Sequence, residues 1–209
     1  MKTSKFLSAI LLAIVCILGF TTCSNDDDGG KSGNFDGVIK VTLSTGNTAV
    51  DEVRPGDGIL KDEMGVNGKY ENGGFTLKLP NPVAAQYLAL MQPAKTIFSN
   101  PELIADSGIT ISDTNTQDIA FDYIKAYKNG NENEVGVFYC ENENGVALMW
   151  VYVDRDASIK GSHTKGGYTD KYNLSLKKGW NKTYQKGGET SWECTSIEPS
   201  GMKWHFEKF

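Results

Sequence analysis

The stretch Val146–Asp154, with the sequence VALMWVYVD, decides the fold class of this chain. Every residue before the terminal aspartate is apolar or aromatic, so an extended segment here has two apolar faces. A strand of that kind lies in the middle of a structure, with other elements on both sides. Its β-branched and aromatic residues favour a strand over a helix. We therefore expect Val146–Asp154 to be a central strand that is covered on both faces.

Short segments with alternating polarity surround this strand. Gly37–Thr45 places Ile39 and Val41 on one face, and Gly68–Pro80 contains an Asn-Gly-Gly turn followed by a second alternating run. From residue 118 onward, hairpins follow one another closely. Short strands with turn signals about every 8–12 residues predict an all-β, antiparallel β-sandwich, with a β-barrel as the alternative. The expected domain is 35–209, which divides into possible halves at 35–80 and 117–209.

Two local predictions are specific enough to be checked. Residues 82–91 are expected to form one short helix, because Asn81 is a good cap, Pro82 suits a first helical position, and the apolar residues 83, 87, 88 and 91 lie on one stripe. Residues 118–127 are expected to form one alternating strand, with Phe121 and Tyr123 on the same face. A short strand is also expected within Gly108–Ser112.

The N-terminus has the features of a secretory signal. A basic start, Met1–Lys5, precedes an apolar run of 15 residues, Phe6–Phe20, which is short for a membrane span. An uncleaved anchor helix is the alternative. The following Phe20–Cys23 resembles the lipobox of bacterial lipoproteins. This resemblance implies that residues 1–22 are removed and that Cys23 receives diacylglycerol and palmitate, which hold the protein on a membrane.

Residues 23–34 form an acidic segment that contains no large apolar side chain after Cys23. Such a composition is typical of a flexible tether. Asp26, Asp27 and Asp28 resemble the acidic export signal in surface lipoproteins of anaerobic gut Gram-negative bacteria. The resemblance implies a location on the outer face of the outer membrane, and a periplasm-facing location is the alternative.

Three further motifs carry a second resemblance: GGFTLKLP at 73–80, DRDASIKG at 154–161 and LKKGWN at 176–181. The chain from Lys69 to Phe209 is similar to uncharacterised lipoproteins of gut anaerobes that share these strand and turn patterns. The segment that begins at Gly37 is also similar to prealbumin-like and carboxypeptidase-regulatory-like modules. Both resemblances imply a secreted β-sandwich, of a prealbumin or immunoglobulin-like kind, without an established activity.

The charge of the chain argues against nucleic acid as a partner. The formal net charge is −5, and it becomes −7 when Lys2 and Lys5 leave with the signal peptide. Arg54 and Arg155 are the only arginines. Proteins that bind nucleic acids carry clustered positive charge instead.

The residues needed for nucleophilic or zinc-dependent hydrolysis are scarce. His163 lies in a Gly-rich segment expected to be a solvated loop, and His205 lies between Trp204 and Phe206 and is expected to face away from both. The chain contains no GxSxG or HExxH motif. In the expected domain, Cys140 and Cys194 both fall on apolar strand faces. Whether they form a disulfide is left open, and two buried free thiols are favoured.

Paired carboxylates offer a second kind of chemistry. Asp154 and Asp156, or Glu141 and Glu143, are candidates for the acid and base of a glycoside hydrolase. The same aspartates, and the oxygen-rich segments 131–134 and 141–144, are candidates for calcium ligands. Charged hairpin tips that keep strand edges soluble are the plainer explanation.

Aromatic residues near the LKKGWN turn are the predicted ligand-binding surface. Trp180 and Tyr184 lie there, and Tyr168, Tyr172 and Trp204 are expected close by. Such rings stack on sugars and anchor protein interfaces, whereas the alternative is that Trp180 packs as a structural lid. The predicted function is therefore non-enzymatic binding of a glycan or a protein, without a metal or cofactor. The alternatives are a carboxylate-dependent glycoside hydrolase and a structural component of the envelope.

Overall fold

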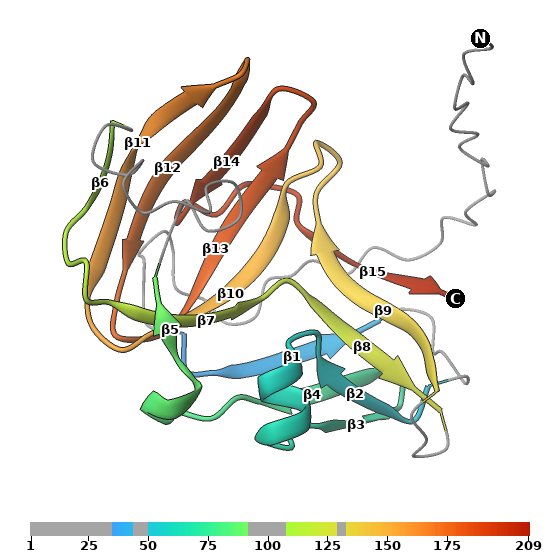
Figure 1. The fold of residues 1–209 in the computed structure, drawn as a ribbon. Coiled ribbons are helices and arrows are strands. Elements are labelled where there is room, and N and C mark those ends of the chain that lie inside the picture. Colours follow the sequence, from blue (N-terminus) through green and yellow to red (C-terminus); the bar gives the residue numbers. More distant parts are fainter. Residues whose placement is uncertain (1–34, 44–49, 92–107, 129–132) are drawn as a thin grey trace, which may run out of the picture.

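The computed structural model describes residues 35–43, 50–91, 108–128 and 133–209. The described chain is almost entirely β-strand, with two short helical turns (Figure 1), so the all-β prediction is confirmed. The predicted signal peptide 1–22, Cys23, the tether 23–34 and Asp26 to Asp28 lie outside the described residues. The first half of the calcium candidate 131–134 also lies outside them.

The elements are short in the first half of the chain and longer in the second half. The strands are β1 (Val38–Thr42), β2 (Glu52–Pro55), β3 (Gly68–Glu71), β4 (Gly74–Lys78), β5 (Ala89–Leu90), β6 (Ile109–Ile111), β7 (Gln117–Phe121), β8 (Tyr123–Tyr127), β9 (Glu134–Glu141), β10 (Ala147–Val153), β11 (Ala157–Lys165), β12 (Tyr168–Leu176), β13 (Gly179–Gly187), β14 (Ser191–Thr195) and β15 (Lys203–Lys208). The helical turns are the π-helix η1 (Ile59–Glu63) and the 3₁₀-helix η2 (Ala85–Tyr87).

Hydrogen bonds join the strands into one sheet with the order β1-β4-β3-β2-β8-β9-β10-β13-β14-β12-β11-β6. Outside this path, β15 pairs with β9, and β7 pairs with β10 and β5. β14 lies between β13 and β12 and runs parallel to β12. In Figure 1 the strands β11 to β14 stand above the layer that β1 to β4 form at the bottom.

β10 is the central strand, as its sequence predicts. It pairs with β13 on one side and with β7 and β9 on the other. Trp150 and Tyr152 enter one hydrophobic core, whereas Val151 and Val153 enter a second core on the opposite face. All four side chains are buried, so the prediction of a strand that is covered on both faces is confirmed.

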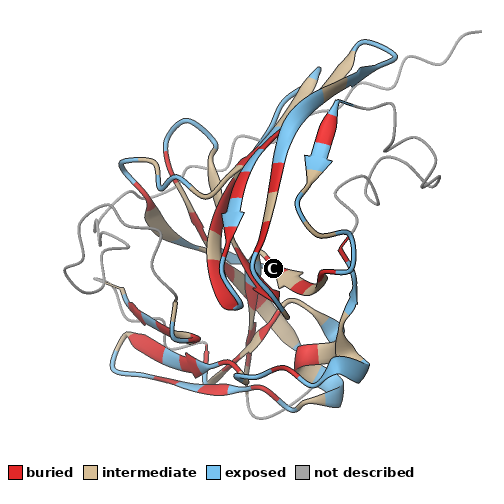
Figure 2. Cartoon of the chain, turned by 90° about the vertical axis from the view of Figure 1, so that its left-hand side faces the viewer, coloured by how far each residue is buried: buried red, intermediate tan, exposed pale blue. Residues whose placement is uncertain are grey.

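The first core joins strands that are far apart in the sheet order. Phe75 of β4 packs against Phe138 of β9, with ring centroids 5.2 Å apart, and against Trp204 of β15 at 6.0 Å. Trp150 stacks on Phe121 at 5.0 Å on the other side of the same core. Figure 2 shows buried residues along the middle of the strands and an exposed tip on the long β11–β12 hairpin.

The β3–β4 hairpin forms where the Asn-Gly-Gly turn predicts it. Asn72 and Gly73 have φ values of 54° and 78°, as a two-residue hairpin turn requires. Gly74 follows because a Cβ atom there would lie 2.3 Å from the carbonyl oxygen of Val41 in the paired strand β1. The predicted strands at β1 and at β6 are also confirmed.

The predicted helix at 82–91 is wrong. The segment forms only the 3₁₀ turn η2, and then Ala89 and Leu90 pair with β7 as strand β5. Val83 and Met91 are buried, but Tyr87 and Leu88 between them are only partly buried. A helix this short is marginal by itself, and pairing with β7 satisfies backbone groups that the helix would have satisfied internally.

The predicted single strand at 118–127 is wrong in its alternation. β7 pairs with β10, β8 pairs with β9 and β2, and Asp122 forms the bend between them. Because this one residue belongs to neither strand, the inward-facing positions shift by one. Phe121 and Ile124 are both buried, whereas Tyr123 is 37% exposed on the outer face.

Cys140 and Cys194 do not pair with each other. Cys194 is a buried free thiol in the second core, and burial raises its pKa to about 12. Cys140 is buried in the first core, so both cysteines point inward as the alternation predicts. The preference for a buried free thiol is confirmed for Cys194.

Candidate functional site

Trp180, the first predicted platform residue, lies in the first core and has no exposed surface. Its indole NH donates to the carbonyl oxygen of Pro80 at 2.8 Å. Its ring packs edge-on against Phe121 and Tyr152, and Phe35 forms a β-bridge to it. A ring enclosed in this way stabilises the fold and offers no face to a sugar.

The other predicted platform residues do not share a surface with one another. Tyr184 is buried, and burial raises the pKa of its phenol strongly. Trp204 is half-buried against Trp150 of the first core, and Tyr172 is buried in the second core. Tyr168 lies at the tip of the β11–β12 hairpin and is half-buried. The structure therefore does not bring the predicted platform together.

Asp154 and Asp156 are held by contacts with their own turn and with residues of β7 and of the β12–β13 turn. The backbone NH of Gln117 donates to Asp154, and Arg155 forms an ion pair with Asp154 at 2.8 Å. The Lys177 ammonium lies 2.8 Å from Asp156. Hydrogen bonds from Arg155 and Lys177 lower the pKa values of the two carboxyl groups. Because a general acid needs a raised pKa, this pair fits a structural role in the turn better than acid–base catalysis.

His163 is not in a loop. It lies in β11, half-buried, directly opposite Asp170 of β12, so the prediction of a solvated loop residue is wrong. Asp170 is buried, and its Oδ1 atom accepts no hydrogen bond from the described residues. Burial raises the pKa of Asp170, and the nearby His163 counteracts part of this rise.

The oxygen-rich tip at 141–144 is organised by the side chain of Asn142. Asn142 accepts hydrogen bonds from the backbone NH groups of Asn144 and Val146 at 3.0 Å each, and its side-chain amide donates to the carbonyl oxygen of Ser200. Within the part of the chain that the structure describes, no group of three or more His, Cys, Asp or Glu residues is placed to hold a metal ion.

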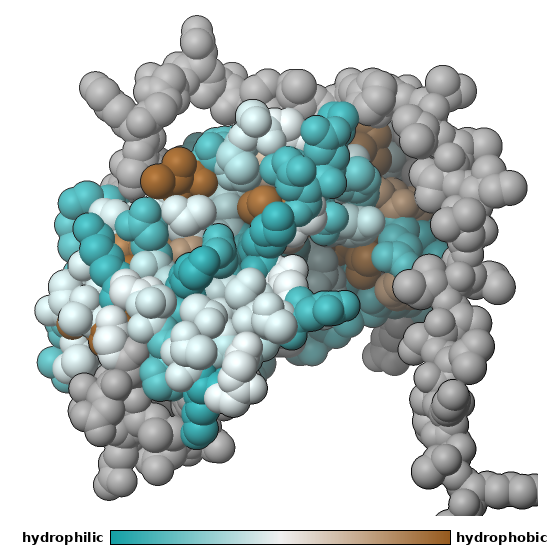
Figure 3. All heavy atoms as spheres, turned by 90° about the horizontal axis from the view of Figure 1, so that it is seen from above, coloured by the Kyte–Doolittle hydropathy of each residue, from teal (hydrophilic) through white to brown (hydrophobic). Residues whose placement is uncertain are grey.

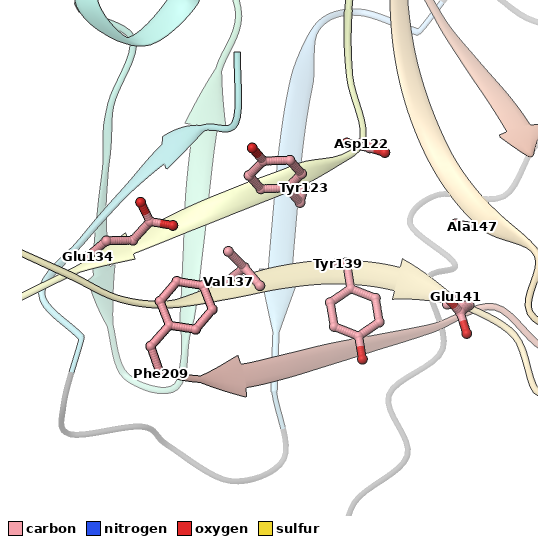
Figure 4. A pocket seen from close by; sticks show the side chains of 8 residues that line it. All are labelled: Asp122, Tyr123, Glu134, Val137, Tyr139, Glu141, Ala147 and Phe209. Carbon is pink, nitrogen blue, oxygen red and sulfur yellow. The ribbon is translucent and has the colours of Figure 1, made fainter. Parts of the chain in front are cut away.

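A hollow of about 410 Å³ lies on the outer face of β8, β9 and β15 (Figure 4). This face is opposite the side from which Phe138 and Ile124 enter the first core. The residues that line the hollow are Asp122, Tyr123, Glu134, Val137, Tyr139, Glu141, Ala147 and Phe209. They belong to β8, β9 and β10, to the bend before β8 and to the residue that follows β15.

The hollow gathers apolar surface that is otherwise scattered. Four large hydrophobic residues are exposed in the described chain: Leu90, Tyr123, Ile197 and Phe209. Two of them, Tyr123 and Phe209, line this hollow. By contrast, the face seen in Figure 3 carries mainly residues of hydrophilic or intermediate character, and its hydrophobic residues form small separate groups. An exposed apolar site with polar residues around it is typical of a binding surface.

Three rings, which we call the ring row, cross this face: Tyr123, Tyr139 and His205. Tyr123 of β8 lies directly opposite Tyr139 of β9, and Tyr139 lies directly opposite His205 of β15. Residues paired in this way share a face and have neighbouring side chains. The Tyr139 and His205 rings stack, with centroids 5.2 Å apart and an interplanar angle of 18°. The prediction that His205 faces away from Trp204 and Phe206 is confirmed, because His205 is exposed.

Three carboxylates surround the ring row. A β-bulge between β8 and β9 turns Glu134 onto the face of the hollow, where it forms an ion pair with Lys125 at 2.9 Å. The Gln185 amide donates to Asp122 at 3.0 Å. Glu141 lies at the far end of β9.

The negative charge of two nearby acids, Glu141 and Glu207, acts on Tyr139, the central ring of the ring row. The pKa of Tyr139 is raised first by its partial burial and then by the negative charges of Glu141 and Glu207. The outer face of β9 is therefore both aromatic and electronegative.

Part of this site has a signal in the sequence. The alternation in Val135–Cys140 places Phe138 and Cys140 together and therefore turns Tyr139 to the other face. Tyr123 has no such signal, because the bend at Asp122 reverses the expected alternation. The pairing of β15 with β9 joins residues more than sixty positions apart and follows no local pattern.

No protein family, curated protein or solved structure matches the chain. Among the described residues, no helix has the length and apolar character needed to cross a membrane.

Proposed function

We propose that this protein is a lipoprotein anchored in the outer membrane through Cys23, exposed at the cell surface, which binds a glycan in the hollow without converting it chemically. The lipobox resemblance at Phe20–Cys23 and the acidic residues 26–28 support the anchoring and the export. The observation that supports binding is the ring row beside three carboxylates.

Each component of the hollow matches a part of a sugar. Aromatic rings stack on apolar faces of ligands, and carboxylates accept hydrogen bonds from hydroxyl groups. Ligand sites commonly combine an apolar surface with a few well-placed polar groups in this way. The ring row runs across three strands, which gives an extended chain several neighbouring contact points.

We also propose that the curled sheet packs as a two-layer β-sandwich. The shared first core supports this, because Phe75 of β4 and Phe138 of β9 contact each other although β3, β2 and β8 separate their strands in the sheet order. Side chains that interdigitate between two layers are the defining feature of a sandwich.

Binding is tested with the purified full-length protein on a glycan array. Tyr139→Ala should weaken the strongest signal about tenfold or more, because a central ring in a hollow behaves as a binding hot spot. Tyr168→Ala is the matched control, since it removes a half-buried tyrosine at the hairpin tip, outside the hollow. Equal loss from both variants, or none from either, contradicts the site. The bound glycan should be recovered unchanged, and its cleavage contradicts a non-enzymatic role.

Anchoring is tested in cells of a Gram-negative host that are fed a palmitate analogue. The wild-type chain should be labelled and should be accessible to added protease at the cell surface. Cys23→Ser should abolish the label, because the acylated thiol is gone. Replacing Asp26, Asp27 and Asp28 with alanine should keep the label but make the chain protease-resistant. An unlabelled wild-type chain contradicts the proposal.

A further inference from the structure

We infer that the glycan in the hollow carries free amino groups, so that its positive charges meet Asp122, Glu134 and Glu141 while its sugar rings stack on the aromatic residues. This inference rests on the proposed glycan binding and names the chemical class of the glycan. A polymer or oligomer of an unacetylated amino sugar is such a ligand.

The charged residues that line the hollow are all acidic. Three of the eight lining residues are acidic, and none is basic. Lys125 pairs with Glu134 beside the hollow, and Lys203 lies opposite Glu141 in the β9–β15 register. Glu207 adds a further acid to the same strand face. With four acids and two lysines, this face is net negative and attracts a cationic ligand while it repels an anionic one.

Two of the three carboxylates, those of Asp122 and Glu141, are not in an ion pair that the structure shows among the described residues, whereas Glu134 is paired with Lys125. Asp122 receives one amide hydrogen bond, on Oδ2, from Gln185. Glu141 lines the hollow at the end of β9, where Lys203 is the residue directly opposite it in β15. An ammonium group donates charge-assisted hydrogen bonds to such oxygens, and these are stronger than bonds from a neutral hydroxyl.

The aromatic residues favour the same class of ligand. Tyr123, Tyr139 and Phe209 present ring surfaces beside these acids, as Figure 4 shows. The face of an aromatic ring attracts a cation through its quadrupole. An amino sugar uses both properties, because its carbon skeleton stacks on the ring and its ammonium group lies near the ring and the carboxylates.

The spacing of the acids favours a chain-like ligand over a single metal ion. The carboxylates do not form a group of three that is placed to hold a metal within the described residues. They come from the β7–β8 bend and from opposite ends of β9, so they are distributed along the hollow. Distributed acids fit a ligand whose charges are also distributed along a chain.

The test compares two hexamers of identical backbone: glucosamine hexamer, which is cationic, and its fully N-acetylated counterpart, which is neutral. Calorimetric titration measures the affinity of the full-length protein for each hexamer. We expect the cationic hexamer to bind about tenfold or more tightly than the neutral one, and we expect this ratio to fall as salt is added. Glu141→Gln should reduce the ratio severalfold. Glu71→Gln, an exposed glutamate outside the hollow, should leave it unchanged.

The outcomes distinguish this inference from the proposed function. If neutral glycans bind as tightly as the amino sugar, and Tyr139→Ala still abolishes binding, the inference is overturned and the proposed function stands. If Glu71→Gln changes the ratio as much as Glu141→Gln does, attraction to the whole acidic protein explains the preference, and the inference is also overturned. If no glycan binds, both are overturned.

Discussion

Trp180 and Tyr139 are large aromatic residues in neighbouring parts of one curled sheet, and the chain uses them in opposite ways. Trp180 follows a polar Lys-Lys-Gly turn, yet it has no exposed surface, because Phe121 and Tyr152, which are distant in the sequence, pack against its ring. Tyr139 lies between two buried residues of β9, yet it faces an open hollow. Exposure is therefore decided by which distant segment covers a face, and the polarity of the adjacent residues is a poor guide to it.

The largest effect that tests this contrast is the loss of the Trp180 ring. Trp180→Ala should lower the free energy of unfolding by about 3–5 kcal/mol, because it removes a fully buried aromatic side chain and leaves a cavity. Urea denaturation measures the change. Tyr168→Ala at the hairpin tip is the control and should cost less than about 1 kcal/mol. A Trp180→Ala protein of nearly normal stability would show that the ring is not part of the core.

The second effect tests the shifted alternation at Asp122. Phe121→Ala removes a ring that stacks on Trp150, whereas Tyr123→Ala removes a ring from the outer face. We expect Phe121→Ala to lower the free energy of unfolding by at least roughly 2 kcal/mol more than Tyr123→Ala does. Urea denaturation of the two variants side by side gives the difference. Equal losses of stability would contradict the bend at Asp122 and would support the single alternating strand that the sequence predicts.

This shift shows what the sequence can and cannot reveal here. Residue type and alternation suffice to predict the all-β class, the turn at Asn72 and the central position of Val146–Asp154. These features depend on neighbouring residues alone. The bend at Asp122 depends instead on a change of partner, from β10 before it to β9 after it.

The candidate site was harder to predict for the same reason. The ring row exists only because β15 pairs with β9, and no local signal in the sequence specifies that pairing. The predicted platform at Trp180 and Tyr184 is wrong because residues distant in the sequence bury both rings. A sequence reports which side chains are available, whereas long-range pairing decides which of them share a surface.

A third, smaller effect addresses how the exposed ring of Tyr123 is held. A Cβ atom at Gly56 would lie 2.7 Å from this ring, so Gly56→Ala should push the ring outward. Because the ring is partly exposed and free to shift, we expect a stability loss of about 1 kcal/mol, together with weaker glycan binding. Gly187→Ala is the matched control, since its Cβ meets nothing within 4 Å. Unchanged binding by Gly56→Ala would show that the position of Tyr123 does not matter to the ligand.

The smallest effects come from two aspartates, one buried (Asp170) and one half-buried (Asp154). Burial raises the pKa of Asp170, so folding is favoured when Asp170 is protonated. That contribution is present below the ordinary pKa and is lost as pH rises through the raised value. The Arg155 contact lowers the pKa of Asp154, so its contribution is present above the ordinary pKa and is lost as pH falls through the lowered value.

The corresponding asparagine variants should therefore change stability in opposite directions. At neutral pH, Asp170→Asn should raise the free energy of unfolding by about 1 kcal/mol. The substitution removes a negative charge from a buried group whose Oδ1 atom accepts no hydrogen bond from the described residues. Asp154→Asn should lower it by less than about 1 kcal/mol, since this ion pair is partly exposed. Urea denaturation between about pH 3 and pH 7 should show both differences shrinking toward acid pH, as the wild-type carboxyl groups become protonated. Changes of the same sign would mean that the charge of Asp170 is compensated in the folded protein, and that burial alone does not separate the two aspartates.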